Sequence, residues 1–331
     1  MIPDNIKKIL KKQHYEIVGK HSAVQICRWT KKSIRDEDVC YKEKFYGIKS
    51  HLCCQMTPAV MWCQNKCVHC WRAIELTLGD KLKGKTDSPK EIINGCIKAQ
   101  IKLLEGFKIL PETKYKTKSK ANMEKWREAQ EPMQFAISLS GEPTVYEKIG
   151  ELISELRKRG KTSFLVTNGL YPEKIRELIK KNQLPTQFYV SVNTSNKNLY
   201  NRFHRSSEKN AWEKLNETLD LMKNLKCRTV FRMNLVRELN MKPEYAKEYA
   251  ELIKKSQCNF IEIKGFMSVG FARQRLGYDK MPTNKEMENF IGLLLKKLKC
   301  TGYKLLNKHE FSRAYVLGKY EKDLKIKENE V

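Results

Sequence analysis

From residue 133 onward, the chain alternates short apolar segments with longer amphipathic ones. The short segments, such as 161–169 and 186–194, are rich in β-branched and aromatic residues, as is typical of strands buried on both faces. The longer segments, such as 171–182 and 242–256, place apolar residues at helical spacing. Because buried strands that alternate with amphipathic helices usually pair in parallel, the pattern predicts an α/β fold.

Five strand–helix units follow from this pattern, and a sixth strand is expected near Met56–Met61, ahead of a helix over 88–106. Six units predict an incomplete (β/α)6 TIM-like barrel, with an open doubly wound sheet as the alternative. Segment 302–318 has the pattern of one or two closing strands. Ligands of such folds gather at the carboxyl ends of the parallel strands, so the functional residues are expected there.

Two parts of the chain differ in pattern. Residues 1–55 carry cysteines without a regular alternation, which predicts an irregular N-terminal extension with one short helix near 4–13. Residues 56–331 are expected to form the partial barrel, within one structural domain overall. Two basic, polar stretches, 77–89 and 111–132, are expected to be loops.

The charge balance limits the class of partner. The 331 residues include 65 Lys and Arg against 38 Asp and Glu, and the net charge of +27 favours a polyanion such as nucleic acid. A solvated surface of mixed charge, the alternative, does not explain the imbalance. The chain has no apolar run of the roughly 18 residues that a membrane helix needs, and its first residues do not resemble a signal peptide. We therefore expect a cytoplasmic protein without membrane contact, whose 11 cysteines stay reduced.

Three cysteines lie close together in the spacing Cys63-x3-Cys67-x2-Cys70. A structural zinc site needs four ligands, and this run offers three unless a histidine such as His69 completes it. The alternative is a [4Fe–4S] cluster held by three thiolates, which leaves one iron open to a small molecule. A group of exposed thiols without metal is disfavoured, because it would oxidise.

The cysteine spacing and the expected partial barrel together resemble the radical S-adenosylmethionine superfamily. The resemblance implies that the open iron chelates S-adenosylmethionine, and that one electron cleaves it to a 5′-deoxyadenosyl radical. SLSGEPT resembles the Gly-Gly-Glu-Pro motif of that superfamily, which implies that Ser140, Gly141 and Glu142 bind the methionyl amino group; an ordinary turn is the alternative. Polar residues end the next two expected strands, where the adenosine and sulfonium are expected: Thr167, Asn168 and Asn193.

Three further cysteines precede this motif at equal intervals of 13 residues: Cys27, Cys40 and Cys53. Their position just ahead of a radical cluster indicates a second three-thiolate [4Fe–4S] site, also with one open iron. Cys54 competes with Cys53 for the third position, and the equal spacing favours Cys53.

The chain from Cys27 to Leu317 resembles the archaeal tRNA 4-demethylwyosine synthases. CVHCWR, SLSGEPTVY, FLVTNG, PTQFYVSV, RTVFRMNLV and FIEIKGFMSVGFARQRL carry the resemblance, although His69 stands where that family usually has an aromatic residue. It implies an enzyme that condenses N1-methylguanosine, beside the anticodon of tRNA-Phe, with pyruvate. The deoxyadenosyl radical would take hydrogen from the N1-methyl group, and the carbon radical would add to pyruvate. Forming a carbon–carbon bond at an unactivated methyl group requires a radical cofactor.

The resemblance also implies further site residues and partners. The second cluster would hold pyruvate, and Lys42, two residues after Cys40, is expected to form a Schiff base with its keto group. An external one-electron reductant of the flavodoxin or ferredoxin type is expected, because the flavodoxin-like domain of eukaryotic relatives is absent from this sequence. We also expect a monomer.

The basic loops and Arg273–Arg275 are expected to contact phosphates of the anticodon stem–loop. Trp71, Phe266 and Phe271 are candidates for stacking on the target base. Two alternatives remain: a radical S-adenosylmethionine enzyme that acts on another substrate, and a metal-stabilised RNA-binding protein without catalysis.

Overall fold

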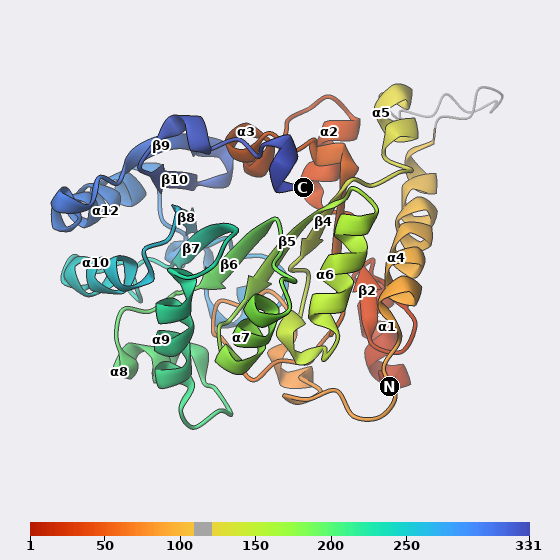
Figure 1. Ribbon diagram of the computed structural model, residues 1–331, viewed down its shortest axis with the longest axis horizontal. Coiled ribbons are helices and arrows are strands. Elements are labelled where there is room, and N and C mark those ends of the chain that lie inside the picture. The colour runs from red at the N-terminus through yellow and green to blue at the C-terminus, as the bar shows by residue number, and fades with distance from the viewer. Residues whose placement is uncertain (109–120) are drawn as a thin grey trace. The chain divides into compact units, whose positions relative to one another are not determined.

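The computed structural model describes residues 1–108 and 121–331, and the chain divides into two compact units (Figure 1). Unit 1 comprises Met1–Val60, Leu82–Leu165 and Lys325–Val331, and unit 2 comprises Met61–Lys81 and Val166–Leu324. The division expected between residues 55 and 56 stays a prediction. In the part of the chain that the structure describes, no helix is long and apolar enough to span a membrane.

Unit 1 is built on a mixed sheet with the strand order β1-β2-β3-β4-β5. The bounds of these strands are β1 Glu16–Val18, β2 Ser22–Val24, β3 Cys53–Thr57, β4 Gln134–Ile137 and β5 Thr162–Thr167. The pairs β1–β2 and β2–β3 are antiparallel, whereas β3–β4 and β4–β5 are parallel. Strand β3 begins earlier than expected, and it ends where Pro58, which has no N–H to donate to a sheet, follows Thr57.

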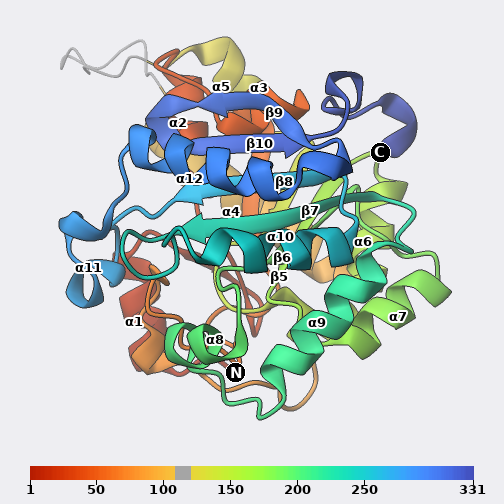
Figure 2. The same cartoon turned by 90° about the vertical axis from the view of Figure 1, so that its left-hand side faces the viewer.

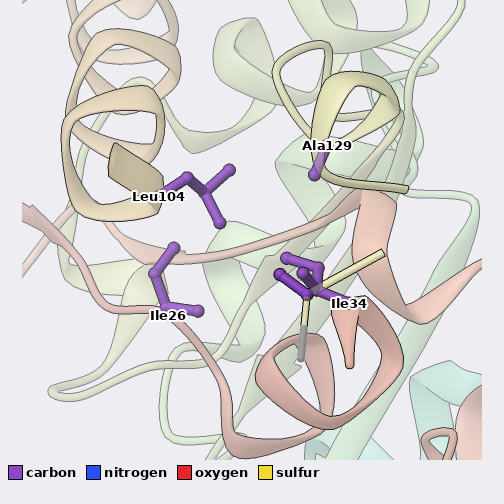
Figure 3. Close-up of a cluster of buried hydrophobic side chains, with 5 residues drawn as sticks. Ile26, Ile34, Leu104 and Ala129 are labelled. Carbon is purple, nitrogen blue, oxygen red and sulfur yellow. The ribbon is translucent and has the colours of Figure 1, made fainter. Parts of the chain in front are cut away.

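The helices of unit 1 are α1 Asp4–Lys12, α2 Arg28–Ile34, α3 Tyr41–Tyr46, α4 Pro89–Leu104, α5 Met123–Glu128 and α6 Ile149–Lys158. Helices α4 and α6 lie side by side (Figure 1). Helix α4 begins as expected at Ser88, whose side chain forms a capping box with Glu91. A buried apolar cluster of Ile26, Ile34, Leu104, Ala121 and Ala129 joins segments that are distant in sequence (Figure 3).

Two expectations for unit 1 were wrong. The N-terminal segment is not irregular, because β1 and β2 form a hairpin on the edge of β3 and three helices are present. Strands of three residues are too short for their periodicity to be recognised in a sequence. The stretch 111–132 is not entirely loop, because α5 lies within it; residues 111–120 are outside the described part of the chain.

Unit 2 contains a mixed sheet with the strand order β6-β7-β8-β10-β9. The bounds of these strands are β6 Gln187–Ser191, β7 Arg228–Leu235, β8 Phe260–Gly265, β9 Lys304–His309 and β10 Ala314–Gly318. Strands β6, β7 and β8 are parallel, and β10 pairs antiparallel with both β8 and β9. The closing strands expected over 302–318 are therefore present.

The helices of unit 2 are α7 Pro172–Lys180, α8 Lys197–His204, α9 Ala211–Met222, α10 Tyr245–Ser256, α11 Ala272–Arg275 and α12 Asn284–Lys297. Helix α10 lies between α9 and α12 and contacts both (Figure 2). The expected α/β fold with six parallel strands, each followed by a helix, is confirmed. The sheet of unit 1 has a free edge at β1 and that of unit 2 has one at β9, so neither sheet closes on itself.

Candidate active site

The cysteines of the C-x3-C-x2-C motif lie in one segment of unit 2, Met61–Lys81, here named the cluster loop. Burial raises the pKa of the Cys67 thiol well above its usual range, and the nearby thiols of Cys70 and Cys63 raise it further. The guanidinium of Arg72 opposes this shift. The three expected thiols thus form one electrostatically coupled group beside a cation.

Arg72 is buried inside the cluster loop. Its guanidinium donates to Asn65 O at 2.7 Å and to Thr77 Oγ1 at 2.8 Å. Burial lowers the pKa of Arg72, but the three thiols and a hydrogen bond to Cys70 outweigh this effect, and the net shift is upward. The positive charge therefore persists where three thiolates would bring negative charge.

The C-terminal end of helix α8 is hydrogen-bonded to the cluster loop. His204 Nδ1 lies 3.0 Å from Cys67 Sγ, and two backbone hydrogen bonds, Lys66 N to His204 O at 2.9 Å and Val68 N to Phe203 O at 3.0 Å, flank this contact. Burial, with a smaller effect of His69, lowers the pKa of His204 to about 3. A neutral imidazole with its proton on Nδ1 would donate to a Cys67 thiolate.

His69 does not complete a metal site in the described residues. Its ring stacks on Phe203, with ring centroids 4.9 Å apart and 28° between the planes. Burial, together with the positive charges of Arg232 and Arg275, lowers the pKa of His69 to about 3. The neutral His69 ring thus stacks on Phe203 as an aromatic side chain at this position would.

Arg275 at the end of α11 is attached to the cluster loop. Its guanidinium donates to Val68 O and Arg72 O, both at 3.2 Å, and to Cys70 O, and it forms an ion pair with Glu75 at 3.0 Å. Only 14% of its side chain is exposed. The expectation that Arg275 contacts RNA phosphates is therefore not supported, because its donors serve the cluster loop.

The expected residues after β5 and β6 lie in unit 2. Asn168 Nδ2 donates to Gln64 Oε1 of the cluster loop at 3.0 Å and lies 3.9 Å from Cys63 Sγ. Thr167 Oγ1 accepts from the N–H two residues later, and Asn193 Oδ1 accepts from the N–H of Asn234. Asn168 is thus brought to the cysteines. Thr167 instead fixes the turn that follows it, and Asn193 binds the backbone of β7.

The Ser140–Glu142 turn follows β4 in unit 1. Gly141 has φ of 78°, a left-handed conformation that other residues rarely adopt, which explains the glycine. Glu142 is buried, and its Oε1 accepts from Thr144 N at 3.1 Å and Thr144 Oγ1 at 2.7 Å. The backbone turn and the buried carboxylate are features that a site for an amino group requires.

Unit 1 brings the upstream cysteines together. Cys27 and Cys40 are the residues preceding α2 and α3, and Cys53 begins β3. Burial raises the pKa of Cys53 well above its usual range; Cys27 raises it further, Lys42 opposes the shift and Cys40 adds to it. The thiols of Cys27 and Cys40 and the Lys42 amine are therefore close enough to Cys53 to shift its pKa, and a cluster at these thiols stays a prediction.

Strand geometry separates Cys53 from Cys54. Successive side chains of a strand point to opposite faces, so the two thiols lie on different sides of β3. Burial raises the pKa of Cys54, and its electrostatic neighbours are Cys96 and Lys161 rather than Cys27 or Cys40. Cys27 and Cys40 therefore influence the pKa of Cys53 and not that of Cys54, which supports the prediction that Cys53 is the third ligand.

Lys42 lies in the first turn of α3 and is buried, with 8% of its surface exposed. Its backbone N–H donates to Cys40 Sγ at 3.4 Å, and its Nζ lies 4.8 Å from the centre of the Phe164 ring. Ser50 fixes the start of the helix, because its Oγ accepts from Cys40 N at 2.8 Å and donates to Glu43 Oε2 at 2.5 Å.

Neither thiol group forms a site for a single metal ion. Among the described residues, no three His, Cys, Asp or Glu side chains converge on one position. Structural zinc requires such convergence, whereas each thiolate of a [4Fe–4S] cluster binds a different iron and stands further from its neighbours. Three coupled thiols with an adjacent cation fit a cluster better than zinc.

Known proteins similar to this chain point to one family. A model described as the radical SAM superfamily matches residues 58–253, and one described as wyosine base formation matches residues 255–319. The S-adenosyl-L-methionine-dependent tRNA 4-demethylwyosine synthase of Pyrococcus abyssi is 43% identical over 97% of this chain and 91% of its own length. The chain belongs to this family of tRNA 4-demethylwyosine synthases. It is therefore a radical S-adenosylmethionine enzyme of wyosine biosynthesis, and the family implies S-adenosylmethionine and a [4Fe–4S] cluster.

Other members of the tRNA 4-demethylwyosine synthase family support this assignment. The enzyme of Methanocaldococcus jannaschii is 35% identical over 96% of both chains. Two solved structures each cover 99% of both chains. One, described as "Structure of TYW1 with a lysine-pyruvate adduct bound", has a TM-score of 0.83 at 34% identity; the other, "Crystal structure of archaeal TYW1", has 0.74 at 31%.

Two residues around the cysteines, Arg72 and His204, were not expected from the sequence, and a third, Arg275, was expected to bind RNA. Arg72 was within reach, because it directly follows the CVHCW segment and a buried cation beside thiolates is a sensible expectation. His204 carries no such indication, since it is 137 residues from Cys67 and only the fold brings them together. Arg275 was noticed but given another partner.

Proposed function

We propose that this enzyme condenses N1-methylguanosine of tRNA-Phe, on the 3′ side of the anticodon, with pyruvate to give 4-demethylwyosine. The observation that carries the proposal is the buried Lys42 beside the thiols of Cys40 and Cys53. A solved structure at 34% identity is described as containing a lysine-pyruvate adduct, which supports pyruvate as the ligand of such a lysine.

Lys42 supplies the nucleophile for pyruvate. Its amine attacks the keto carbon, water leaves, and a Schiff base joins the substrate to the protein. The first turn of α3, fixed by Ser50 and Glu43, orients the amine, and the Phe164 ring covers one side of it. The thiols of Cys27, Cys40 and Cys53 would hold a second [4Fe–4S] cluster, which would supply a Lewis acid for binding pyruvate.

The radical half of the reaction uses the cluster loop. Cys63, Cys67 and Cys70 would hold the [4Fe–4S] cluster, which would supply the electron for reductive cleavage of S-adenosylmethionine. Ser140, Gly141 and Glu142 would bind the methionyl amino group, and the adenosine and sulfonium would lie near a second set of residues: Thr167, Asn168 and Asn193. Three further points stay predictions: an external reductant, a monomeric state and a cytoplasmic location. Action on tRNA supports the cytoplasmic location.

Reductive trapping tests the role of Lys42. Wild-type enzyme incubated with pyruvate and cyanoborohydride is expected to gain the mass of one reduced pyruvate adduct, located at Lys42 by peptide mass spectrometry. Lys42→Ala should lose both the adduct and 4-demethylwyosine formation while its iron and sulfide content stays at the wild-type level. Lys44→Ala, which removes an exposed lysine of the same helix, is the matched control and should behave as wild type.

A Lys42→Ala protein that makes 4-demethylwyosine at the wild-type rate would contradict the proposal. An adduct on another lysine would instead move the nucleophile and leave pyruvate as the substrate. If wild-type enzyme makes no product from methylguanosine-bearing tRNA, pyruvate, S-adenosylmethionine and dithionite, the substrate assignment itself fails.

A further inference from the structure

Three aromatic side chains are more than half exposed in the part of the chain that the structure describes: Tyr278 at 66%, Phe311 at 55% and Tyr320 at 60%. The first two lie within residues 255–319, which the wyosine model matches, and the third directly follows. A large ring left in water forgoes the stabilisation of burial. Such rings are therefore candidates for contact with a partner.

The pairing of β10 with β8 separates Phe311 from Tyr320. Ala314, at the start of β10, pairs with Lys264 near the carboxyl end of β8, whereas Gly318 pairs with the first residue of β8. Phe311 precedes Ala314 and Tyr320 follows Gly318, so the two rings lie at opposite ends of β8. Phe311 is at the end where ligands of parallel strands bind.

Tyr278 lies on the segment that follows the carboxyl end of β8. Lys280 O in this segment accepts a hydrogen bond of 3.0 Å from Arg237 N, which comes just after β7. The same segment contains Arg275, whose guanidinium holds three carbonyls of the cluster loop. The segment that carries Tyr278 is thus attached directly to the cysteine motif.

The charges around these two rings are mixed, with one exposed arginine beside Tyr278. Arg273 is exposed, and its guanidinium carbon lies 5.8 Å from the centre of the Tyr278 ring. The acidic neighbours Asp279 and Glu310 are each paired with a lysine, at 3.1 and 2.7 Å. Lys280 also pairs with Glu238, and Lys308 also pairs with Glu288 at 3.2 Å, so each lysine is shared by two carboxylates. The cation that faces a polyanion here is therefore Arg273, in a chain whose net charge is +27.

We propose that Tyr278, Arg273 and Phe311 form a surface on which unpaired bases of the tRNA anticodon loop stack. This inference rests on the proposed function, since it takes that tRNA as the substrate. Aromatic rings and guanidinium planes stack on splayed-out bases of single-stranded RNA. Stacking on this surface would hold the loop in register while the target guanosine enters the site beside the cluster loop.

The surface replaces the aromatic residues expected from the sequence. Phe266 is 1% exposed and packs in a buried apolar cluster with Phe203, so it is unsuited to stacking on RNA. Trp71 and Phe271 are half-buried, and a backbone hydrogen bond of 2.9 Å from Phe271 N to Trp71 O joins their segments. This backbone contact attaches the α11 segment to the cluster loop, and both rings are less exposed than those of Tyr278 and Phe311.

Binding of a synthetic tRNA-Phe anticodon stem–loop that contains N1-methylguanosine tests the surface. Tyr278→Ala and Phe311→Ala should each weaken binding by roughly 5- to 150-fold, the effect of losing one stacked base. A 2-aminopurine placed beside the methylguanosine should be quenched by wild type and brighter with these variants. Tyr278→Phe, which keeps the ring, should restore both signals.

Tyr320→Ala is the matched control. Tyr320 is equally exposed and has Lys322 Nζ at 5.8 Å from its ring, as Tyr278 has Arg273, but it lies at the opposite end of β8. Its removal should change affinity by less than about twofold. Arg273→Gln should reduce the slope of log affinity against log salt by about one, while Tyr278→Ala leaves that slope unchanged.

The outcomes separate this inference from the proposed function. Failure of wild type to bind the stem–loop would remove the substrate assignment. Tight wild-type binding that Tyr278→Ala and Phe311→Ala leave intact would overturn the stacking surface alone. The stacking surface would also be overturned if these variants slow electron delivery from flavodoxin without changing RNA affinity. The rings would then contact a protein partner instead of RNA. Equal melting temperatures of all variants exclude unfolding as the cause of any loss.

Discussion

At the scale of residues, each cysteine group of this enzyme has its own cation. Arg72 is coupled to the thiols of the cluster loop, and Lys42 to those of unit 1. The two cations differ in use, because a guanidinium stays charged at any working pH whereas a lysine amine can lose its proton and attack a carbonyl. The residue type at each position thus agrees with an electron-transfer role in one group and a covalent role in the other.

Replacement of Arg275 by Met is expected to loosen the cluster loop, because three carbonyls and Glu75 lose their shared donor. We expect a lower iron content after anaerobic reconstitution and faster loss of iron to a chelator, measured by absorbance and iron analysis. Arg275→Lys should give an intermediate result, since an ammonium cannot bridge the same set of acceptors. Full iron retention in Arg275→Met would show that the loop does not depend on this side chain.

At the scale of elements, helix α3 has only six residues, and its ends are held by other segments. Ser50 fixes the N-terminal end near Cys40. At the other end Lys325 Nζ donates to Lys44 O at 2.7 Å, and Ile326 N donates to Tyr46 O at 3.1 Å. Because so short a helix is unstable alone, these contacts determine where Lys42 lies.

Lys325→Ala is expected to slow pyruvate adduct formation at Lys42, because α3 loses the cation at its C-terminal carbonyls. The rate of cyanoborohydride trapping measures this effect, with an expected decrease of about 2- to 10-fold from a contact of the usual strength. Lys327→Ala, two residues further along the same tail, is the control. If wild type, Lys325→Ala and Lys327→Ala are trapped at equal rates, the contact of Lys325 with α3 does not influence the reactivity of Lys42.

Helix α12 provides a pH-dependent test of stability. Its capping box joins Thr283 and Glu286, and Arg237 lies 2.6 Å from the Glu286 carboxylate. The hydrogen bond from Arg237 is the largest cause that lowers the pKa of Glu286, from 4.5 to about 2. A lowered folded-state pKa stabilises the fold above pH 4.5, and this stabilisation is lost as the pH falls toward 2.

Glu286→Gln should therefore lower the melting temperature at pH 7, with an effect of about 1 kcal/mol, since the pair is partly exposed and screened. The difference from wild type should shrink as the pH falls below 4.5. Scanning calorimetry from pH 7 to pH 3 measures it. A difference that is constant with pH would assign the effect to the capping geometry rather than to the charge.

The sequence predicted the elements with strong periodicity and the motifs that lie within one segment. The six parallel strands and the start of α4 at Ser88 belong to this class, whereas the ligand roles of the two cysteine groups stay predictions. The preference for Cys53 over Cys54 stays a prediction, although the alternation of side chains on β3 gives it a physical reason that required the strand bounds. Contacts such as His204 with Cys67 join distant segments, and no local pattern indicates them.

At the scale of the whole molecule, the two thiol groups lie in different compact units, Cys27, Cys40 and Cys53 in unit 1 and the cluster loop in unit 2. Each group has its own supporting contacts, so we expect the two clusters to assemble independently. Reconstituted wild-type protein should contain roughly eight irons, from two cubane clusters of four. The triple Cys→Ala variant of either group should keep roughly four, measured by iron analysis and electron paramagnetic resonance. Loss of all iron in either variant would contradict independent assembly.

Unit 1 combines the first sixty residues with Lys325–Val331, and this has a consequence for biosynthesis. The contact between Lys325 and Lys44 spans 281 positions of the chain. At typical translation speeds, the ribosome makes the intervening residues, including all of unit 2, in roughly 14 to 56 s. During that interval the nascent α3 exists without its C-terminal contacts. The contacts that hold the C-terminal end of α3 are therefore completed only after translation has passed unit 2.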